Sequence, residues 1–389
     1  MTKEKIPDFR FSGYTDAWEE RKLGEIGTVA MNKRIFKEQT SANGDIPFFK
    51  IGTFGGRPDA YISRELFEEY KEKYPYPNEG DLLISASGSI GRIVEYKGED
   101  AYYQDSNIVW LNHSGNLNNL FLKQFYENVT WEGIEGTTIK RLYNKNILNT
   151  QIVLPSLPEQ ESIGTFFHQL DDLLTLHQRQ LDLLKEHKKT YLRLLFPAKG
   201  QKVPALRFDS FEGDWEEKKL GEVAEITMGQ SPSSTNYTAN PSDYILVQGN
   251  ADLKNGYVFP RVWTTQITKT ADAGDLIISV RAPVGDAAKT AFDVVLGRGV
   301  AGIKGNEFLF QTLSKLKNDG YWKRLSTGST FESINSDDIK STIIQIPSLP
   351  EQEAIGNFFS TLDEEITQVE KKLASLKTMK ATLLRKLFV

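Results

Sequence analysis

The sequence predicts an α+β protein in which two tandem globular domains are separated by two long antiparallel coiled-coil helices. Three observations carry this prediction. The chain repeats itself as a pseudo-twofold pair, each copy ends in a segment with heptad spacing, and both of these segments change from acidic to basic along their length. We expect the globular domains to cover residues 1–154 and 201–346, and the helices to lie within residues 155–200 and 347–389.

Composition narrows the class of protein. A chain of 389 residues is long enough for two domains that each bury a core, and 39% hydrophobic with 25% charged residues is ordinary for a globular protein. The absence of Cys and the presence of only four His exclude a disulfide framework and a thiolate metal site, so we expect no metal. No stretch approaches the roughly 18 apolar residues that cross a bilayer, and no apolar leader follows the first Met. We therefore expect a cytoplasmic protein without membrane contact.

The duplication is the most informative feature. Trp18–Glu25 recurs 197 residues later as Trp215–Glu222, and Gly80–Ser85 returns as Gly274–Ser279. Repeats of this kind indicate two copies of one structural unit. Because each Trp opens its copy just before a Leu-Gly-Glu segment, we expect both indoles to pack in a core rather than to stack on a ligand.

A second repeat closes each copy. Pro155–Gly164 matches Pro347–Gly356 at nine of ten positions, and apolar residues at coiled-coil spacing follow both segments. Such a seam predicts long amphipathic helices that pack against each other. The residues that we expect to form this helix-helix spacer are Phe167, Leu170, Leu174, Leu181, Leu184, Phe359, Leu362, Ile366, Leu373 and Leu376.

The predicted helix starts are marked by the same signal twice. Ser156 with Glu159, and Ser348 with Glu351, fit a capping box in which serine and glutamate satisfy the first free amides. Pro197 indicates the end of the first helix.

Charge predicts how the helices pair. Because each is acidic first and basic later, an antiparallel pair places acid beside base, whereas a parallel pair aligns like charges. A helix over 159–196 would be about 57 Å long and would hold the two domains at opposite ends of a rod. Lys188 and Lys380 interrupt the two seams at equivalent positions, and we expect each to reach solvent or a carboxylate through its long stem.

The repeated motifs carry a family resemblance. Trp-Glu-x-x-x-Leu-Gly-Glu opens each copy, and Leu-Pro-Ser-Leu-Pro-Glu-Gln at 154–160, with Ile in place of the first Leu at 346–352, closes it. Over essentially the whole chain this looks like the specificity subunit of type I restriction-modification systems. The resemblance implies two target recognition domains, each of which reads one half of an asymmetric, interrupted site in double-stranded DNA. It also implies a subunit without catalysis or cofactor of its own.

The same resemblance implies partners. Two methyltransferase (M) subunits and two restriction (R) subunits would bind this chain, and S-adenosylmethionine, ATP and magnesium would be bound by those subunits. The net charge of −5 agrees with such an assembly, because a protein that holds DNA unaided normally presents a basic face. We therefore expect partners to supply much of the grip on DNA phosphates.

Loops between strands are the expected DNA-facing elements. Arginine and lysine suit guanine or phosphate, glutamine and asparagine suit adenine, and hydroxyls in Gly-Thr-Thr and Gly-Ser-Thr turns suit phosphates. For each residue, exposed surface or an ordinary turn remains an alternative interpretation. The candidate residues are Lys50, Arg57, Ser87, Arg92, Thr137, Thr138, Lys140, Arg141, Gln248, Asn250, Arg281, Ser329 and Thr330.

Two other classes of protein compete with this interpretation. A stand-alone nuclease would need a site such as Asp59 with Glu69 and Lys71, although such triplets arise often in so charged a chain. A protein-binding coiled-coil scaffold is compatible with the composition. A methyltransferase is poorly supported, because 240–243 reads Asn-Pro-Ser-Asp rather than the required Asn/Asp-Pro-Pro-aromatic, and no Gly-Lys-Ser/Thr phosphate loop is present.

Overall fold

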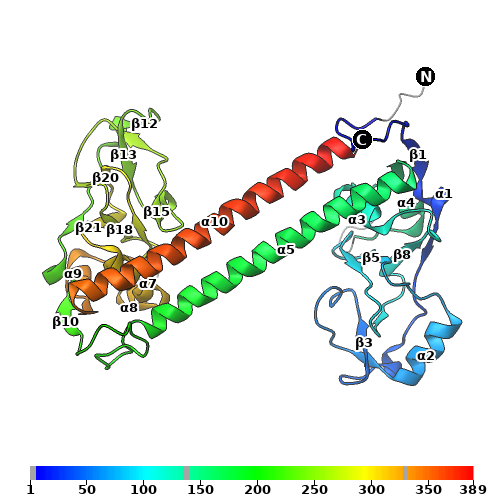
Figure 1. The fold of residues 1–389 in the computed structure, drawn as a ribbon, viewed down its shortest axis with the longest axis horizontal. Helices are drawn as coiled ribbons and strands as arrows, with labels where there is room; N and C mark the ends of the chain where they lie inside the picture. Colours follow the sequence, from blue (N-terminus) through cyan, green and yellow to red (C-terminus); the bar gives the residue numbers. More distant parts are fainter. Residues whose placement is uncertain (1–5, 135–139, 327–331, 389) are drawn as a thin grey trace. The chain divides into compact units, whose positions relative to one another are not determined.

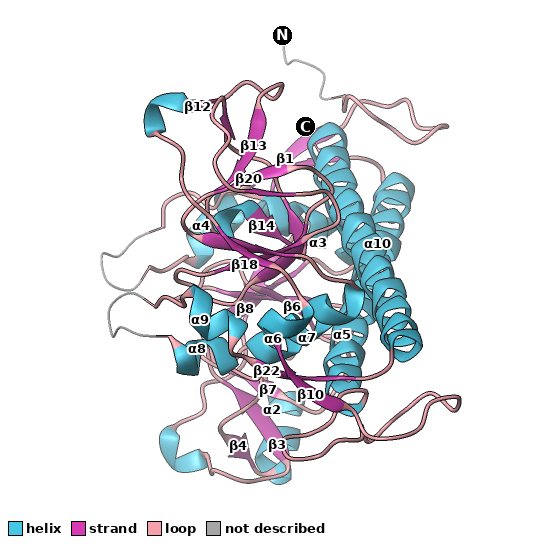
Figure 2. Cartoon of the chain, turned by 90° about the vertical axis from the view of Figure 1, so that its left-hand side faces the viewer, coloured by secondary structure: helices cyan, strands magenta, loops and turns pink. Residues whose placement is uncertain are grey.

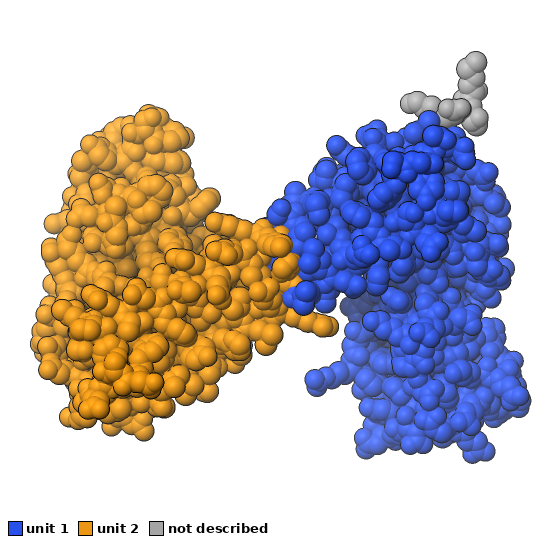
Figure 3. Space-filling view, in the orientation of Figure 1, with its two compact units in different colours: residues 1–176, 373–389 blue, residues 177–372 orange. Residues whose placement is uncertain are grey.

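A computed structural model describes residues 6–134, 140–326 and 332–388. The chain divides into two compact units, Met1–Leu176 with Leu373–Val389 (unit 1) and His177–Lys372 (unit 2), which Figure 3 colours separately. Both divisions fall inside long helices, so each unit holds a globular part and a segment of each helix. None of the helices in the described ranges is long and apolar enough to cross a membrane.

Unit 1 alternates short strands with short helices before the first long helix begins (Figure 1). Its elements are β1 (Glu19–Lys22), α1 (Leu23–Ile26), β2 (Thr28–Ala30), η1 (Lys37–Gln39), β3 (Ile46–Phe49), β4 (Tyr61–Ile62), α2 (Arg64–Lys73), β5 (Leu82–Ser85), β6 (Ile93–Glu95), β7 (Tyr102–Tyr103), β8 (Ile108–Asn112), α3 (Asn119–Asn128), α4 (Asn144–Asn149), β9 (Gln151–Leu154) and α5 (Leu157–Leu194), which continues into unit 2. The strands form an antiparallel sheet of order β2-β8-β5-β6, a second sheet of order β4-β3-β7, and the pair β1-β9.

Unit 2 repeats this plan with additional strands. Its elements are β10 (Glu216–Lys219), α6 (Leu220–Val223), β11 (Ile226–Met228), η2 (Ser234–Asn236), β12 (Tyr237–Thr238), β13 (Tyr244–Val247), η3 (Asn250–Asp252), β14 (Leu253–Lys254), β15 (Tyr257–Val258), β16 (Trp263–Thr264), β17 (Thr270–Ala271), β18 (Leu276–Ser279), β19 (Ala287–Lys289), β20 (Val294–Leu296), β21 (Val300–Ile303), α7 (Glu307–Asn318), α8 (Tyr321–Leu325), α9 (Ser336–Lys340), β22 (Ile343–Ile346) and α10 (Leu349–Leu387), which ends in unit 1. Figure 2 displays the mixture of helices and strands.

The pairing of strands makes the repeat explicit. The order β11-β21-β18-β19 in unit 2 matches β2-β8-β5-β6 in unit 1, and β10-β22 matches β1-β9. In both units one parallel pair, β3-β7 or β13-β20, lies in the second sheet. The central strands β5 and β18 have four buried residues each, because Leu-Leu-Ile-Ser and Leu-Ile-Ile-Ser have apolar side chains on both faces. The predicted α+β fold with an internal repeat is therefore confirmed.

Both repeated tryptophans lie in a core, as predicted. Trp18 is 4% exposed in the cluster that includes Phe121 and Phe167, and Trp215 is 1% exposed in the cluster that includes Phe308. The aromatic residues make edge contacts with the tryptophans at ring-centroid distances of 6.2 Å for Trp18–Phe121 and 5.6 Å for Trp215–Phe308. Each indole therefore packs inside the core of its unit and presents no surface on which a ligand could stack.

The long helices α5 and α10 have 38 and 39 residues and run antiparallel. In unit 2, Lys185 bonds Glu370 and Lys188 bonds Asp363, so the numbering rises along one helix as it falls along the other. All ten predicted spacer residues are buried or half-buried. Of the two outcomes expected for the seam lysines, solvent or a carboxylate, both reach a carboxylate, because Lys380 bonds Asp171 at 2.5 Å in unit 1.

The capping-box prediction for the two glutamates was wrong. The Glu159 carboxylate, which is fully buried, accepts two hydrogen bonds of 2.7 Å from the Arg10 guanidinium, and Glu351 accepts two of 2.8 Å from Arg207. A guanidinium fork matches both carboxylate oxygens at once, so it competes successfully with a single backbone amide. The segment before each globular part is thereby fixed to the start of a long helix.

Candidate nucleic-acid interface

The loop that follows β5 is shaped by a buried serine. The Ser85 hydroxyl donates to the Ser89 carbonyl and accepts from the Arg92 amide at 2.9 Å, so it spans the loop from one side to the other. Gly91 has φ +81°, a conformation that residues with a side chain rarely adopt. The loop Ala86–Gly91 therefore has a fixed backbone that presents the residues between its ends.

The loop after β18 has the same construction. The Ser279 hydroxyl donates to the Pro283 carbonyl at 2.8 Å and accepts from the Asp286 amide at 2.9 Å, and Gly285 has φ +85°. Ser85 is thus the counterpart of Ser279, and both are the last residues of the duplicated strands. The Gly80–Ser85 repeat signalled the strand, but the scaffolding role of its serine emerges only from these hydrogen bonds.

In unit 1 this loop meets two further segments. Ser87 forms an isolated antiparallel β-bridge with Arg141, and the Ser87 hydroxyl donates to the Asn107 side chain at 2.8 Å. The Arg141 guanidinium in turn donates to the Ser106 hydroxyl at 3.2 Å. The structure therefore brings two predicted residues, Ser87 and Arg141, together with the turn that precedes β8.

In unit 2 the same bridge is made with the two side chains exchanged. Arg281 occupies the place of Ser87, and its bridge partner is Ser333, which occupies the place of Arg141. The neighbouring bond is also shared, since the Val280 amide donates to the Gly299 carbonyl at 2.9 Å as Ala86 does to Asn107. One backbone scaffold thus carries Ser opposite Arg in one unit and Arg opposite Ser in the other.

Three more predicted residues lie near the loop of unit 1. The exposed Arg92 reaches the Phe54 carbonyl with Nη1 at 2.7 Å, which places it against the segment that holds Lys50 and Arg57. Arg57 is exposed and Lys50 is half-buried. These cations therefore belong to one group of loops at the ends of β3 and β5.

The counterpart of Lys50 in unit 2 is Gln248, which also follows the strand that forms the parallel pair. The buried Asp252 carboxylate shapes this turn by accepting from the amides of Gln248 at 2.7 Å and Gly249 at 3.2 Å, and from Arg261 Nε at 3.0 Å. Gln248 and Asn250 are both half-buried. The turn therefore has a rigid backbone with two amide side chains at its surface.

The loops of unit 2 carry a further cation, Arg298, that no sequence pattern singled out. Arg298 is exposed between two buried glycines, Gly297 and Gly299, and its amide donates to the Ser231 hydroxyl at 3.0 Å. The Gly-Arg-Gly string was a signal that could have identified it, because glycines permit close backbone approach around a presented side chain.

The remaining predicted residues can be placed only in part. Lys140 is exposed, and its carbonyl accepts from the Gly88 amide at 3.3 Å. Four others lie outside the described residues, and these are Thr137, Thr138, Ser329 and Thr330.

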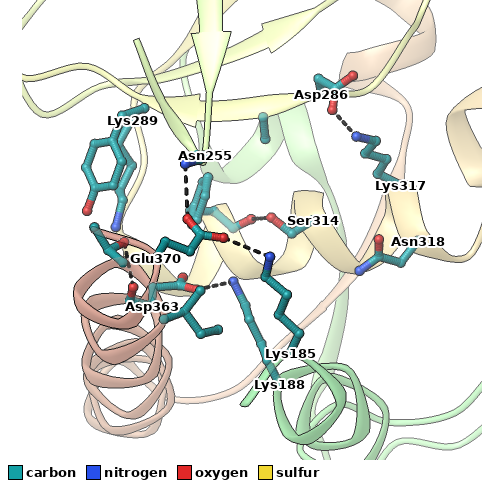
Figure 4. A pocket seen from close by; sticks show the side chains of 16 residues that line it. Lys185, Lys188, Asn255, Asp286, Lys289, Ser314, Lys317, Asn318, Asp363 and Glu370 are labelled. Carbon is teal, nitrogen blue, oxygen red and sulfur yellow. Dashed lines mark hydrogen bonds and ion pairs between the residues drawn. The ribbon is translucent and has the colours of Figure 1, made fainter. Parts of the chain in front are cut away.

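A polar cavity of about 400 Å³ in unit 2 lies where both long helices meet the globular part (Figure 4). Its charges pair with one another. Glu370 accepts from Lys185 at 2.7 Å and from the Asn255 side chain at 3.1 Å, and Asp363 accepts from Lys188 at 2.5 Å. The two lysine bonds join α5 to α10, and the Asn255 bond joins α10 to the globular part, so the cavity is a structural joint.

Lys289 at the edge of this cavity illustrates the same pairing. Burial is the largest single influence and would lower the pKa of Lys289, but the 2.8 Å hydrogen bond to Glu307, the charge of Glu307 and the contact with Tyr257 together outweigh it, and the pKa is raised. Lys289 is therefore a fixed cation that joins β19 to α7.

The residues of the alternative nuclease site do not converge. Asp59 pairs with Lys50 at 2.8 Å, Glu69 pairs with Lys73 at 3.1 Å, and Lys71 lies over aromatic rings. Within the described residues, no group of three or more His, Asp or Glu is arranged to hold a metal ion.

Comparison with known proteins gives a consistent result. The family model described as type I restriction modification DNA specificity domain matches residues 15–186 and 212–378. A putative type I restriction enzyme specificity subunit of Methanocaldococcus jannaschii is 30% identical over 384 residues, which cover 91% of this chain and 89% of that protein.

The chain belongs to the type I restriction-modification DNA specificity family.

Two further relatives match this chain, one in the sequence of about half of the chain and the other in its fold. A putative type I specificity subunit of Haemophilus influenzae is 50% identical over 171 residues, which span 43% of this chain and 44% of that relative. The crystal structure of the S subunit of the type I system from M. genitalium matches 98% of this chain and 99% of its own, with a TM-score of 0.70 at 17% identity. That likeness supports the two-copy fold.

Membership in the specificity family places this chain among the non-catalytic DNA-recognition subunits of type I systems. The loops described above are candidates for contact with DNA, because a specificity domain must present side chains to DNA from a rigid support. The family match covers both copies, so both sets of loops belong to specificity domains.

Proposed function

We propose that this chain reads an asymmetric, bipartite DNA site, with one half read by the loops of unit 1 and the other by the loops of unit 2. The supporting observation is the exchanged bridge, in which Ser87 faces Arg141 but Arg281 faces Ser333. A shared backbone with different donors presents the same scaffold to two different base sequences. The two halves of the site would therefore differ.

Different side chains would contact different parts of the DNA. Arg92, Arg141 and Arg281 suit guanine edges or phosphates, and Gln248 with Asn250 suits adenine in the major groove. Lys50, Arg57 and Lys140 suit phosphates. With a net charge of −5, the chain would depend on partner subunits for much of its non-specific affinity for DNA.

The chain would position two adenine methyltransferase subunits and, for cleavage, two restriction subunits on this site. S-adenosylmethionine, ATP and magnesium would then be bound by those partners. The gap between the half-sites would have a constant length, because α5 and α10 are each continuous and joined by paired charges.

The direct test is to coexpress the chain with its cognate methyltransferase subunit and to map methylated adenines across a genome at single-base resolution. An interrupted motif with unlike halves and one gap length supports the proposal. Replacing residues 1–150 with the first domain of another family member should change one half of the motif and leave the other unchanged. A change in both halves, or a symmetric motif, would contradict it.

A gel shift on the assembled complex separates DNA recognition from a purely protein-binding scaffold. Phosphate contacts give an affinity that falls steeply as salt is added. A scaffold whose globular parts bind only protein would give no shift at any salt concentration.

A further inference from the structure

The turn Gly297–Gly299 of unit 2 is held on three sides. The Gly297 amide donates to the Val247 carbonyl at 2.7 Å, the Arg298 amide donates to the Ser231 hydroxyl at 3.0 Å, and the Gly299 carbonyl accepts from the Val280 amide at 2.9 Å. Three separate segments of the chain therefore fix the backbone of this turn. A side chain presented from such a turn has its Cα position determined before any ligand arrives.

The Arg298 side chain itself is exposed and has no partner within the described parts of the chain. Arg261 of the same unit differs, because its guanidinium is held by Asp252 at 3.0 Å. A fixed backbone with an unengaged guanidinium fork leaves all five donors of the side chain available to a ligand.

A second unengaged arginine lies on the adjacent loop. Arg281 follows Val280, whose amide bonds the Gly299 carbonyl, so the two arginines project from neighbouring, hydrogen-bonded segments. Arg281 is also exposed and, among described residues, makes no side-chain ion pair. Two unengaged guanidinium forks thus lie on adjacent segments that are hydrogen-bonded to each other.

The corresponding turn of unit 1, residues 104–107, contributes no cation of its own. Ser106, at φ +55°, lies in the segment whose Asn107 carbonyl accepts from Ala86, and the Ser106 hydroxyl is already bonded by Arg141. A residue that served the shared backbone, or a phosphate contact common to both units, would be expected in both turns. Arg298 therefore distinguishes the turn of unit 2 from that of unit 1, as a residue that determines the specificity of one unit should.

From this contrast we infer that Arg298 is a specificity-determining residue that donates two hydrogen bonds to a guanine in the half-site read by unit 2. A guanidinium fork matches guanine O6 and N7 in the major groove, and no other base offers that pair of acceptors. The inference rests on the proposed function and adds to it the base class and the residue.

The test uses the full chain with its methyltransferase partner and compares Arg298→Ala and Arg298→Lys with wild type by genome-wide adenine methylation mapping. Both variants should relax one G:C position of one half-site by roughly 5- to 100-fold, because lysine keeps the charge but loses the fork. The other half-site should stay unchanged. Lys218→Ala is the control, since this exposed lysine on β10 lies outside the loops and its loss removes the same charge.

The outcomes separate the inference from the proposed function. A wild-type chain without a bipartite motif would overturn both. If wild type gives a bipartite motif and Arg298→Ala gives the same motif at the same level, the inference alone fails. A uniform loss of methylation without a relaxed position would identify a phosphate contact and would also overturn it. A melting temperature within about 2 °C of wild type should accompany the expected result, since Arg298 is exposed.

Discussion

Lys188 on α5 and Asp363 on α10 form an ion pair of 2.5 Å in which each side chain is only 20% exposed. The same relationship recurs in unit 1, where Lys380 bonds Asp171 at 2.5 Å and Glu127 at 2.8 Å. Both carboxylates also approach a glutamine of the globular part, Gln311 at 3.0 Å and Gln124 at 3.4 Å. The two lysines that interrupt the apolar seams are therefore joints between the helices and the globular parts.

Replacing Lys380 with leucine should destabilise the protein although it completes the apolar seam. The change leaves Asp171 and Glu127 without their main partner, and the loss for such a half-buried network should be about 2 kcal/mol. Urea unfolding of the variant measures it. Lys377→Leu, at an exposed position of the same helix, should change stability by less than about 0.5 kcal/mol. Equal effects of the two changes would mean that the ion pair contributes nothing.

The stability contributed by Lys380 should depend on pH in a defined direction. Burial tends to lower the pKa of Lys380, but hydrogen bonds to Asp171 and Glu127 outweigh it, and the pKa is raised above its ordinary 10.5. A raised pKa in the folded state gives stability that is complete below the unfolded value and is lost as pH rises through the folded value. The stability gap between wild type and Lys380→Met should be constant near pH 8 and should narrow above about pH 10.5. Urea titrations at both pH values check this, and a gap that widens would contradict it.

Arg10 and Glu159 should be strongly coupled. Arg10→Met leaves the Glu159 carboxylate, which is fully buried, without a counter-charge. The free energy of unfolding should fall by roughly 3–5 kcal/mol. The double variant Arg10→Met with Glu159→Met should recover most of that loss, because no buried charge remains. Denaturant unfolding of the two single variants and the double variant measures the coupling. Additive losses would indicate that the pair acts through packing alone.

Sequence patterns predicted the long helices and the buried tryptophans, because both follow from the spacing of apolar residues along the chain. The heptads gave the two helices, and the repeated Trp-Glu motifs gave the cores around Trp18 and Trp215, because burial follows from apolar periodicity. The partner of Glu159 was not predictable, since Arg10 lies 149 residues away and its role depends on tertiary contact. The capping rule was correct about the helix start but could not weigh a competing guanidinium.

The candidate interface was predictable as a set of loops but not in its detail. The sequence suggested that Arg92 and Arg281 are equivalent, because both follow the duplicated strand. The hydrogen bonds of Ser85 and Ser279 instead make Ser87 the counterpart of Arg281. Arg298 was overlooked because its turn has no similar string in the first copy. Residues that differ between copies cannot be found by searching for repeats, although they are the ones that would distinguish two half-sites.

The close approach of three backbones at Gly299 provides a test of loop rigidity. A Cβ at Gly299 would collide with the Gln248 carbonyl oxygen, so Gly299→Ala must displace the turn that presents Arg298 or the one that presents Gln248. Gly249→Ala is the matched control, because a Cβ at Gly249 meets nothing within 4 Å and its φ of 176° is open to any residue. We expect Gly299→Ala to weaken specific DNA binding by the assembled complex at least about tenfold, while the melting temperature falls by only a few degrees. Gly249→Ala should bind as wild type does. If both variants bind DNA equally well, the rigid presentation of these loops is not needed for recognition.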